Sequence, residues 1–232
     1  AVQFTCSECG TVSGRWLGRC PGCGSFGTLT EERVGAPQAA TARPLLRLVD
    51  VAVDESERIP TGVDELDRVL GGGLVPGAAI LLSGEPGVGK STLLLEVAAR
   101  SAQAGRRVLY ASAEESTAQV RLRAERTGAL HDELYLASET DLATILGHVD
   151  DVTPDLLIVD SVQTVSSAMS DGAPGQPAQV REVAGTLIRV AKERNLPLLL
   201  VGHVTKDGTI AGPRMLEHLV DGDAAAGWAR LH

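Results

Sequence analysis

Short apolar runs alternate with segments of helical periodicity through most of the chain. Apolar runs at 78–83, 108–111, 134–136, 156–160 and 198–201 predict buried strands. Segments 91–104, 117–126, 141–149 and 180–194 predict helices, and Val183, Leu187 and Val190 recur at helical spacing in the last of them. Continuous apolar strands separated by helices indicate an α/β fold with a mostly parallel central sheet covered on both faces. Ligands of such sheets bind beyond the carboxyl ends of the strands.

Two other segments precede this alternation. Residues 1–30 hold all four cysteines of the chain. Residues 31–44 are rich in small residues, contain proline and lack periodicity, which predicts a linker. The predicted α/β domain then covers residues 45–221, and residues 222–232 form a separate tail.

The sequence GEPGVGKST, at 84–92, lies between a predicted strand and a predicted helix. It matches G-x-x-x-x-G-K-[ST] in the context that this phosphate-binding motif requires. Its backbone amides would surround phosphate oxygens, Lys90 would neutralise the β and γ oxygens, and the Ser91 hydroxyl would bind Mg²⁺. The predicted nucleotide contacts are Gly84, Glu85, Pro86, Gly87, Val88, Gly89, Lys90, Ser91 and Thr92. The alternative is a glycine-rich turn with a chance lysine.

Three polar residues follow other predicted strands. Asp160 ends LLIVD and suits a Walker-B carboxylate that holds Mg²⁺ directly or through water, whereas an isolated strand-end aspartate is usually a turn residue. His203 could bond the γ-phosphate or the attacking water, or be an ordinary loop histidine. Glu114 follows the strand at 108–111, which we expect beside the phosphate-loop strand. We predict that Glu114, rather than Glu115, orients a water in line with the γ-phosphorus.

The cysteines form two C-x₂-C pairs, Cys6/Cys9 and Cys20/Cys23, with ten residues between them. Glycines 10 and 24 follow the pairs and permit tight turns. Two such knuckles predict a tetrahedral four-cysteine zinc site that is structural and supplies most of the folding energy of this small segment. A redox C-x-x-C is the alternative. Trp16, between the knuckles, is expected to pack on the metal site rather than to offer a stacking surface.

Composition narrows the classes of function. The net charge of −9 argues against a general nucleic-acid coat but allows a local basic loop or a channel built from several subunits. Aromatic residues make up 3% of the chain, so the core is built from aliphatic side chains. No apolar stretch reaches the length of a membrane span, and the clustered cysteines suit a reducing cytosol. We therefore expect a cytoplasmic protein.

The chain resembles the bacterial RadA/Sms DNA-repair proteins, which are RecA-like P-loop ATPases with an N-terminal zinc finger. The resemblance rests on CSECG…GRWLGRCPGCG, TGVDELDRVLGGG, GEPGVGKST, SAEES, LIVDSVQT and GHVTKDGTIAGPR, and it runs from about Phe4 to Asp221. It implies that Glu114 is the catalytic glutamate, that Asp160 is the Walker-B aspartate and that residues 84–92 form the nucleotide loop. Lys90 and His203 are the other candidate catalytic residues.

The resemblance also implies a biological role. The expected cofactors are ATP, Mg²⁺ and Zn²⁺. The expected function is DNA-dependent ATP hydrolysis that drives branch migration of recombination intermediates, in a hexamer that binds single-stranded DNA and works with recombinase and repair proteins. Loops 166–179 and 206–214 would face the channel of the ring, with Lys206 and Arg214 as phosphate contacts. We expect the first loop to be irregular.

The end of the chain departs from the family pattern. After LEHLVD the family continues into another strand, a lysine–asparagine–arginine–phenylalanine–glycine motif and a Lon-like domain, whereas this chain reads GDAAAGWARLH. We expect an ATPase domain that is incomplete at its C-terminus and a sheet with an open edge after 198–201. One alternative function is a non-catalytic module that binds ATP and either DNA or a partner. Another is a replicative helicase or a clock-type kinase, against which the four cysteines and GHVTKDG argue.

Overall fold

The computed structural model describes residues 2–33, 58–84, 87–203 and 222–223. The chain divides into two compact units, of which the first ends at Val53 and the second begins at Asp54. Each unit is described by itself.

The first unit is a small antiparallel sheet in the order β2-β1-β3. Its strands are β1 (Val2–Cys6), β2 (Val12–Ser13) and β3 (Leu29–Arg33). Its core consists of Cys6, Cys20 and Leu29, with Phe4 and Leu17 packed against them. β3 continues to residue 33, so the first three residues of the predicted linker belong to this sheet. A core of this size is too small to hold a fold without a metal or a disulfide.

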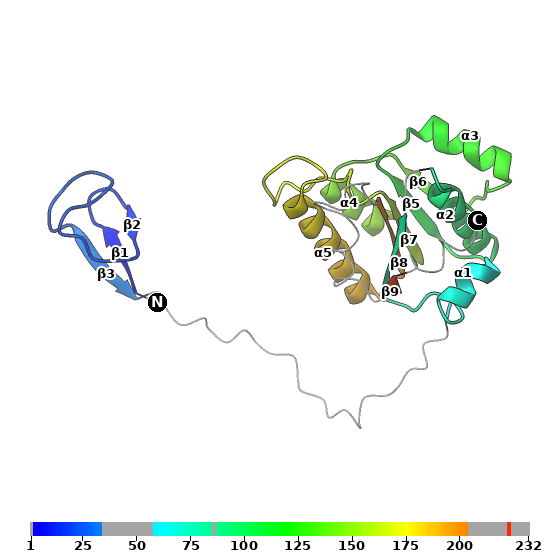
Figure 1. The fold of residues 1–232 in the computed structure, drawn as a ribbon, viewed down its shortest axis with the longest axis horizontal. Helices are drawn as coiled ribbons and strands as arrows, with labels where there is room; N and C mark the ends of the chain where they lie inside the picture. The colour runs from blue at the N-terminus through cyan, green and yellow to red at the C-terminus, as the bar shows by residue number, and fades with distance from the viewer. Residues whose placement is uncertain (1, 34–57, 85–86, 204–221, 224–232) are drawn as a thin grey trace, which may run out of the picture. The chain divides into compact units, whose positions relative to one another are not determined.

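The second unit contains the predicted parallel sheet, in the order β6-β5-β7-β8-β4-β9. The five predicted strands are present as β4 (Ala79–Gly84), β5 (Val108–Ser112), β6 (Leu134–Ala137), β7 (Leu156–Asp160) and β8 (Leu198–His203). All pairings between the described strands of this sheet are parallel. The carboxyl ends of the strands therefore meet at one edge of the sheet, as Figure 1 shows.

Two predictions about the order of the strands are wrong, and the tail contains a short strand that the sequence does not predict. β8 lies inside the sheet, between β7 and β4, and does not form an edge. β5 does not lie beside β4, because β7 and β8 separate the two strands. The tail begins with a short strand, β9 (Gly222–Asp223), which pairs with Ile80 and Leu81 of β4. Strand pairing is made by backbone hydrogen bonds, so a segment of weak strand propensity can still pair with a neighbouring strand.

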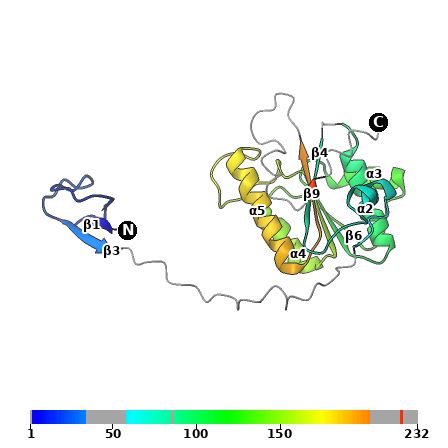
Figure 2. The same cartoon turned by 60° about the horizontal axis from the view of Figure 1, so that its bottom comes forward.

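Helices cover both faces of the sheet, as Figures 1 and 2 show. One face carries α2 (Lys90–Gln103) and α3 (Thr117–Thr127), and the other carries α4 (Leu142–Val152) and α5 (Pro177–Arg194). Two clusters of buried aliphatic residues fill the two interfaces. Leu66 of α1 (Asp64–Val69), a helix too short to stand out in the sequence, joins the cluster under α2 and α3.

Three of these helices begin at residues that are typical of helix N-termini. Ser116 and Gln119 form a capping box at the start of α3, and Asp141 accepts a hydrogen bond from the Thr144 amide at the start of α4. Pro177 occupies the first turn of α5. α2 differs, because its N-cap is Gly89 and, among the described residues, no side chain caps it.

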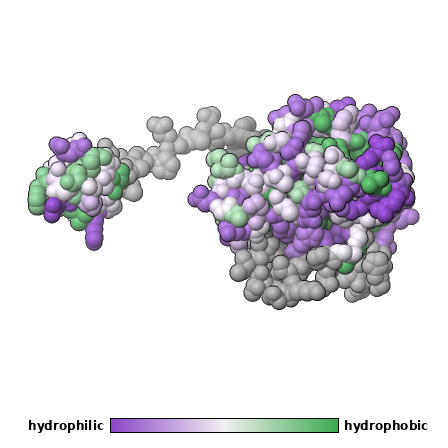
Figure 3. Space-filling model, turned by 90° about the horizontal axis from the view of Figure 1, so that it is seen from above, coloured by the Kyte–Doolittle hydropathy of each residue, from purple (hydrophilic) through white to green (hydrophobic). Residues whose placement is uncertain are grey.

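Polar side chains dominate the visible surface of the second unit, and apolar ones lie scattered among them (Figure 3). Within the described part of the chain, no helix has the length and apolar character needed to cross a bilayer.

Candidate nucleotide and zinc sites

The phosphate loop connects the buried strand β4 to α2. Gly87 and Gly89 have φ angles of +85° and +89°, a left-handed conformation that side chains disfavour. Lys90 is 4% exposed, and its ammonium donates a hydrogen bond to the Gly84 carbonyl at 2.9 Å. The open N-terminus of α2 presents its first amides beside this lysine, an arrangement that binds phosphate oxygens. Glu85 and Pro86 lie outside the described residues.

Lys90 lies within the electrostatic reach of two carboxylates. Burial lowers the pKa of Lys90, while the negative charges of Asp160 and Glu114 act in the opposite direction. Ser91 is half-buried and Thr92 exposed in the first turn of α2. The carboxylates and the ammonium therefore form one polar cluster at the carboxyl edge of the sheet.

Asp160 ends β7 and is 4% exposed. Its Oδ2 accepts a hydrogen bond from the Tyr110 hydroxyl at 2.9 Å. Its Oδ1 is buried and has no hydrogen-bond partner among the described residues. A buried carboxylate oxygen without a partner is unfavourable in a protein interior. Oδ1 is the kind of hard oxygen ligand that Mg²⁺ prefers, so the site fits the predicted metal.

Glu114 lies two residues beyond β5 and connects three strand ends. Its Oε1 accepts a hydrogen bond from the Ser161 hydroxyl at 2.5 Å and lies 2.7 Å from His203 Nε2. The hydrogen bond with His203 lowers the pKa of Glu114, which burial opposes, and Ser161 and the charge of Lys90 lower it further. Glu114 is thus an ionised carboxylate that other side chains hold at the polar edge.

Glu115 has a different environment from its neighbour. Its carboxylate forms an ion pair with Arg123 of α3, and its backbone amide donates a hydrogen bond to Ser112 Oγ at 3.2 Å. Its side chain is therefore committed to the helix that follows. This placement agrees with the choice of Glu114 over Glu115 as the candidate catalytic residue.

His203 ends β8, and Nε2 of its ring contacts Glu114. Its side chain is 25% exposed, and Nδ1 is buried without a partner among the described residues. The amide of Gln163 donates to the His203 carbonyl at 3.3 Å, which ties this strand end to the segment after β7. Glu114, Asp160 and His203 each place one ligand atom within 4.8 Å of the others.

The four cysteines of the first unit also converge. Their Sγ atoms all lie within 4.8 Å of one another, with Cys6–Cys23 at 3.7 Å and Cys9–Cys20 at 3.6 Å. Four sulfurs each about 2.3 Å from one tetrahedral zinc lie about 3.8 Å apart, so the spacing fits zinc. The cysteines form no disulfide. A hydrogen bond with Thr28 lowers the pKa of Cys6 to about 6, which favours the thiolate that zinc requires.

Two further predictions about this unit concern the glycines of its turns and Trp16. Gly10 and Gly24 have φ angles of +71° and +77°, and their amides donate to the carbonyls of Cys6 and Cys20. The glycines therefore close the knuckles as the sequence predicts. Trp16 is 61% exposed, so the expectation that it packs on the metal site is wrong.

Models of known protein families match both units of the chain. The family model described as an AAA domain matches residues 41–209, and the one described as a rubredoxin metal binding domain matches residues 4–31. The chain belongs to the AAA domain family. ATP and Mg²⁺ are the cofactors of this domain, and Zn²⁺ is the metal of the four-cysteine unit.

Similar curated proteins are bacterial. The chain is 53% identical to the DNA repair protein RadA of Mycolicibacterium smegmatis, with 94% of this chain and 50% of that protein aligned. The corresponding protein of Mycobacterium tuberculosis is 53% identical over 94% of this chain and 48% of its own length. That of Bacillus subtilis is 42% identical over 94% and 50%. The chain therefore spans about half the length of the curated relatives that it matches.

One of the two predicted DNA-facing loops of the AAA domain is described in full. Segment 166–179 is irregular only up to residue 176, because α5 begins at Pro177. Gln179, 2% exposed, accepts a hydrogen bond from the Ser167 amide and donates to the carbonyls of Ser167, Ser170 and Gly172. One buried side chain therefore fixes the loop, at whose surface Met169 is 85% exposed. Lys206 and Arg214, in the other loop, lie outside the described residues.

The sequence alone does not identify two residues of the candidate nucleotide site, Tyr110 and Ser161. Tyr110 lies inside a predicted strand and looks like an ordinary core residue, and Ser161 lies in a turn. Their partners, Asp160 and Glu114, are 50 and 47 residues away along the chain. Only the pairing of β5 with β7 brings these groups together, and no local motif reports it.

The lowered pKa of Glu114 predicts a pH dependence of stability. An acid whose pKa is lowered in the folded state stabilises the fold above its ordinary pKa of 4.5, and this contribution is lost as the pH falls through the lowered value. We expect wild type to lose more melting temperature than Glu114→Gln between neutral pH and pH values below 4.5. Calorimetry measures the melting temperature of each protein as a function of pH. If the melting temperatures of wild type and Glu114→Gln fall equally with pH, the pKa of Glu114 is not lowered in the folded state.

Proposed function

We propose that the chain is the ATP-hydrolysing part of a DNA-repair protein. It binds ATP, Mg²⁺ and single-stranded DNA, and it drives branch migration of recombination intermediates as a hexamer with recombinase and repair partners. One observation carries the enzymatic part: Lys90, Glu114 and Asp160, from three separate segments, meet at the carboxyl edge of the sheet. The similarity of the chain to bacterial proteins named DNA repair protein RadA supports the biological part.

The residues have separate roles in this proposal. The amides at the start of α2 and the Lys90 ammonium bind the phosphates and compensate their charge. Asp160 and Ser91 would hold Mg²⁺, and the bound ion would supply positive charge that offsets the charge of the triphosphate. Glu114 accepts a hydrogen bond from the attacking water and orients it, and His203 and Ser161 hold the carboxylate for that task.

A second candidate is a module that binds ATP without hydrolysing it and contacts DNA or a partner through its zinc unit. ATP hydrolysis measured with and without single-stranded DNA distinguishes the two candidates. Hydrolysis stimulated by DNA supports the enzyme, whereas nucleotide binding with no turnover supports the module.

DNA contact by the loop at 206–214 has its own test. We expect Lys206→Ala and Arg214→Ala each to weaken single-strand binding and to reduce the slope of log affinity against log salt by about 0.7, as the loss of one phosphate contact does. Lys192→Ala, on the exposed surface of α5, is the matched control and is expected to keep the wild-type slope. Unchanged slopes for both loop variants would remove this loop from the DNA interface. Fluorescence anisotropy over a range of salt concentrations measures the effect.

A further inference from the structure

Tyr110 lies on the sheet face that α2 and α3 cover, one pleat before Asp160. Tyr110 pairs with Ile158, and Ser112 pairs with Asp160, so the Tyr110 and Asp160 side chains are diagonal neighbours on one face. The Tyr110 hydroxyl donates to Asp160 Oδ2 at 2.9 Å, and the two residues are 2% and 4% exposed. A hydrogen bond to an ionised acceptor in such a buried place is stronger than an average one.

This bond gives the two oxygens of Asp160 different environments. Oδ2 is occupied by the phenol proton, whereas Oδ1 has no partner among the described residues. The phenol hydroxyl is the donor of this bond, and the carboxylate oxygen is its acceptor. A tyrosine that serves only to fill the core has no need of this polar contact, since a phenylalanine would fill the same space.

We propose that Tyr110 is a positioning residue that fixes the Asp160 carboxylate so that Oδ1 faces the Mg²⁺ of the nucleotide complex. The inference rests on the proposed function, which assigns Asp160 to this metal. Hydrogen-bond partners of metal-ligating carboxylates restrict the rotation of the carboxylate and raise metal affinity, and their loss typically costs about 10- to 100-fold.

Manganese is a suitable probe, because its binding to the nucleotide complex is visible by electron paramagnetic resonance without turnover. We expect Tyr110→Phe to weaken Mn²⁺ binding about tenfold in the presence of a non-hydrolysable ATP analogue. The Mg²⁺ concentration for half-maximal hydrolysis should rise by a similar factor, and kcat at saturating Mg²⁺ should stay near wild type. The affinity for the analogue without metal should not change.

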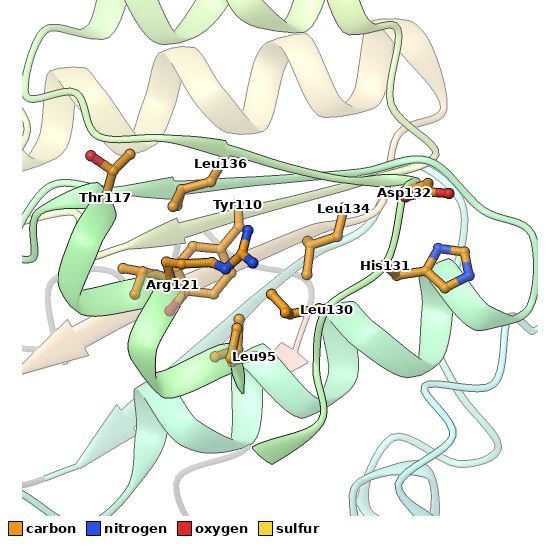
Figure 4. Close-up of a pocket in the computed structure, with 11 residues that line it drawn as sticks. Leu95, Tyr110, Thr117, Arg121, Leu130, His131, Asp132, Leu134 and Leu136 are labelled. Carbon is orange, nitrogen blue, oxygen red and sulfur yellow. The ribbon is translucent and has the colours of Figure 1, made fainter. Parts of the chain in front are cut away.

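Two control variants separate positioning from packing. Tyr135→Phe removes the hydroxyl of the second tyrosine of the chain, which is 40% exposed on β6. Leu134→Ala enlarges a pocket of about 590 Å³ that Tyr110 and Leu134 both line, as Figure 4 shows, without touching the hydroxyl. We expect wild-type Mn²⁺ affinity in both, with a lower melting temperature in Leu134→Ala only. In an Asp160→Asn background, Tyr110→Phe should cause no further loss of Mn²⁺ affinity.

The outcomes separate this inference from the proposed function. Wild-type Mn²⁺ affinity in Tyr110→Phe overturns the positioning role, as does an equal loss in Leu134→Ala. A wild-type chain that forms no Mn²⁺–nucleotide complex at all overturns the proposed function instead. Loss of Mn²⁺ affinity in Tyr110→Phe alone, with unchanged metal-free nucleotide binding, supports the inference.

Discussion

Glu114→Gln is expected to bind ATP with near wild-type affinity and to hydrolyse it about 10²- to 10⁴-fold more slowly. The glutamine has nearly the shape of the glutamate and can still contact Ser161, so the site should stay folded. It lacks the negative charge that attracts the proton of the attacking water. Steady-state phosphate release measures the rate, and titration with a fluorescent ATP analogue measures binding.

Glu115→Gln is the matched control for this prediction. Glu115 is adjacent in sequence, but its carboxylate pairs with Arg123 on α3 rather than with Ser161 and His203. We expect its hydrolysis rate to lie close to that of wild type and its stability to fall slightly, because a partly exposed ion pair is lost. A Glu114→Gln rate near wild type, or an equal loss in both variants, would refute the assignment of Glu114 as the catalytic residue.

Removal of zinc is expected to unfold the first unit and to leave the second unit folded. The core of the first unit consists of two cysteines and one leucine, so almost all of its stability must come from the metal, whose binding to such peptides is worth about 10–16 kcal/mol. Cys20→Ser removes one of the two buried ligands. We expect the variant to lose its bound zinc and trypsin to cleave at Arg15 and Arg19 much faster than in wild type.

The prediction about zinc has one control in the first unit and one in the second. Ser7→Ala changes a residue between two ligands without removing a thiolate, so zinc content and protease resistance should stay unchanged. Nucleotide affinity should survive in Cys20→Ser, because the AAA domain has its own two-sided core. A zinc-free chain whose first unit still resists trypsin would contradict the structural role. Disulfides in place of metal would favour the redox alternative.

Contiguous motifs account for what the sequence predicts well. The phosphate loop is nine consecutive residues between a strand and a helix, and the two knuckles are separated by ten residues. Each motif encodes its own local geometry, and continuous apolar runs mark the five long strands. Short elements carry too few residues to show a period, so α1 and β9 were not predicted.

The sequence does not predict the order and register of the strands, and the contacts within the candidate site depend on both. β8 follows β7 in the chain but enters the sheet between β7 and β4, so the distance between Glu114 and the phosphate loop depends on strand order. The contact between Glu114 and His203 spans 89 residues, and that between Tyr110 and Asp160 spans 50. These contacts follow from strand register, which a single sequence leaves undetermined.

Triphosphate binding at the start of α2 is tested by titrating the purified chain with a labelled ATP analogue, with and without Mg²⁺. The Lys90→Ala variant is titrated in parallel. The phosphate-binding edge predicts a saturable complex that Mg²⁺ tightens and that Lys90→Ala loses. If wild type forms no complex, or if Lys90→Ala binds equally well, the amides and the ammonium at the start of α2 do not bind a triphosphate.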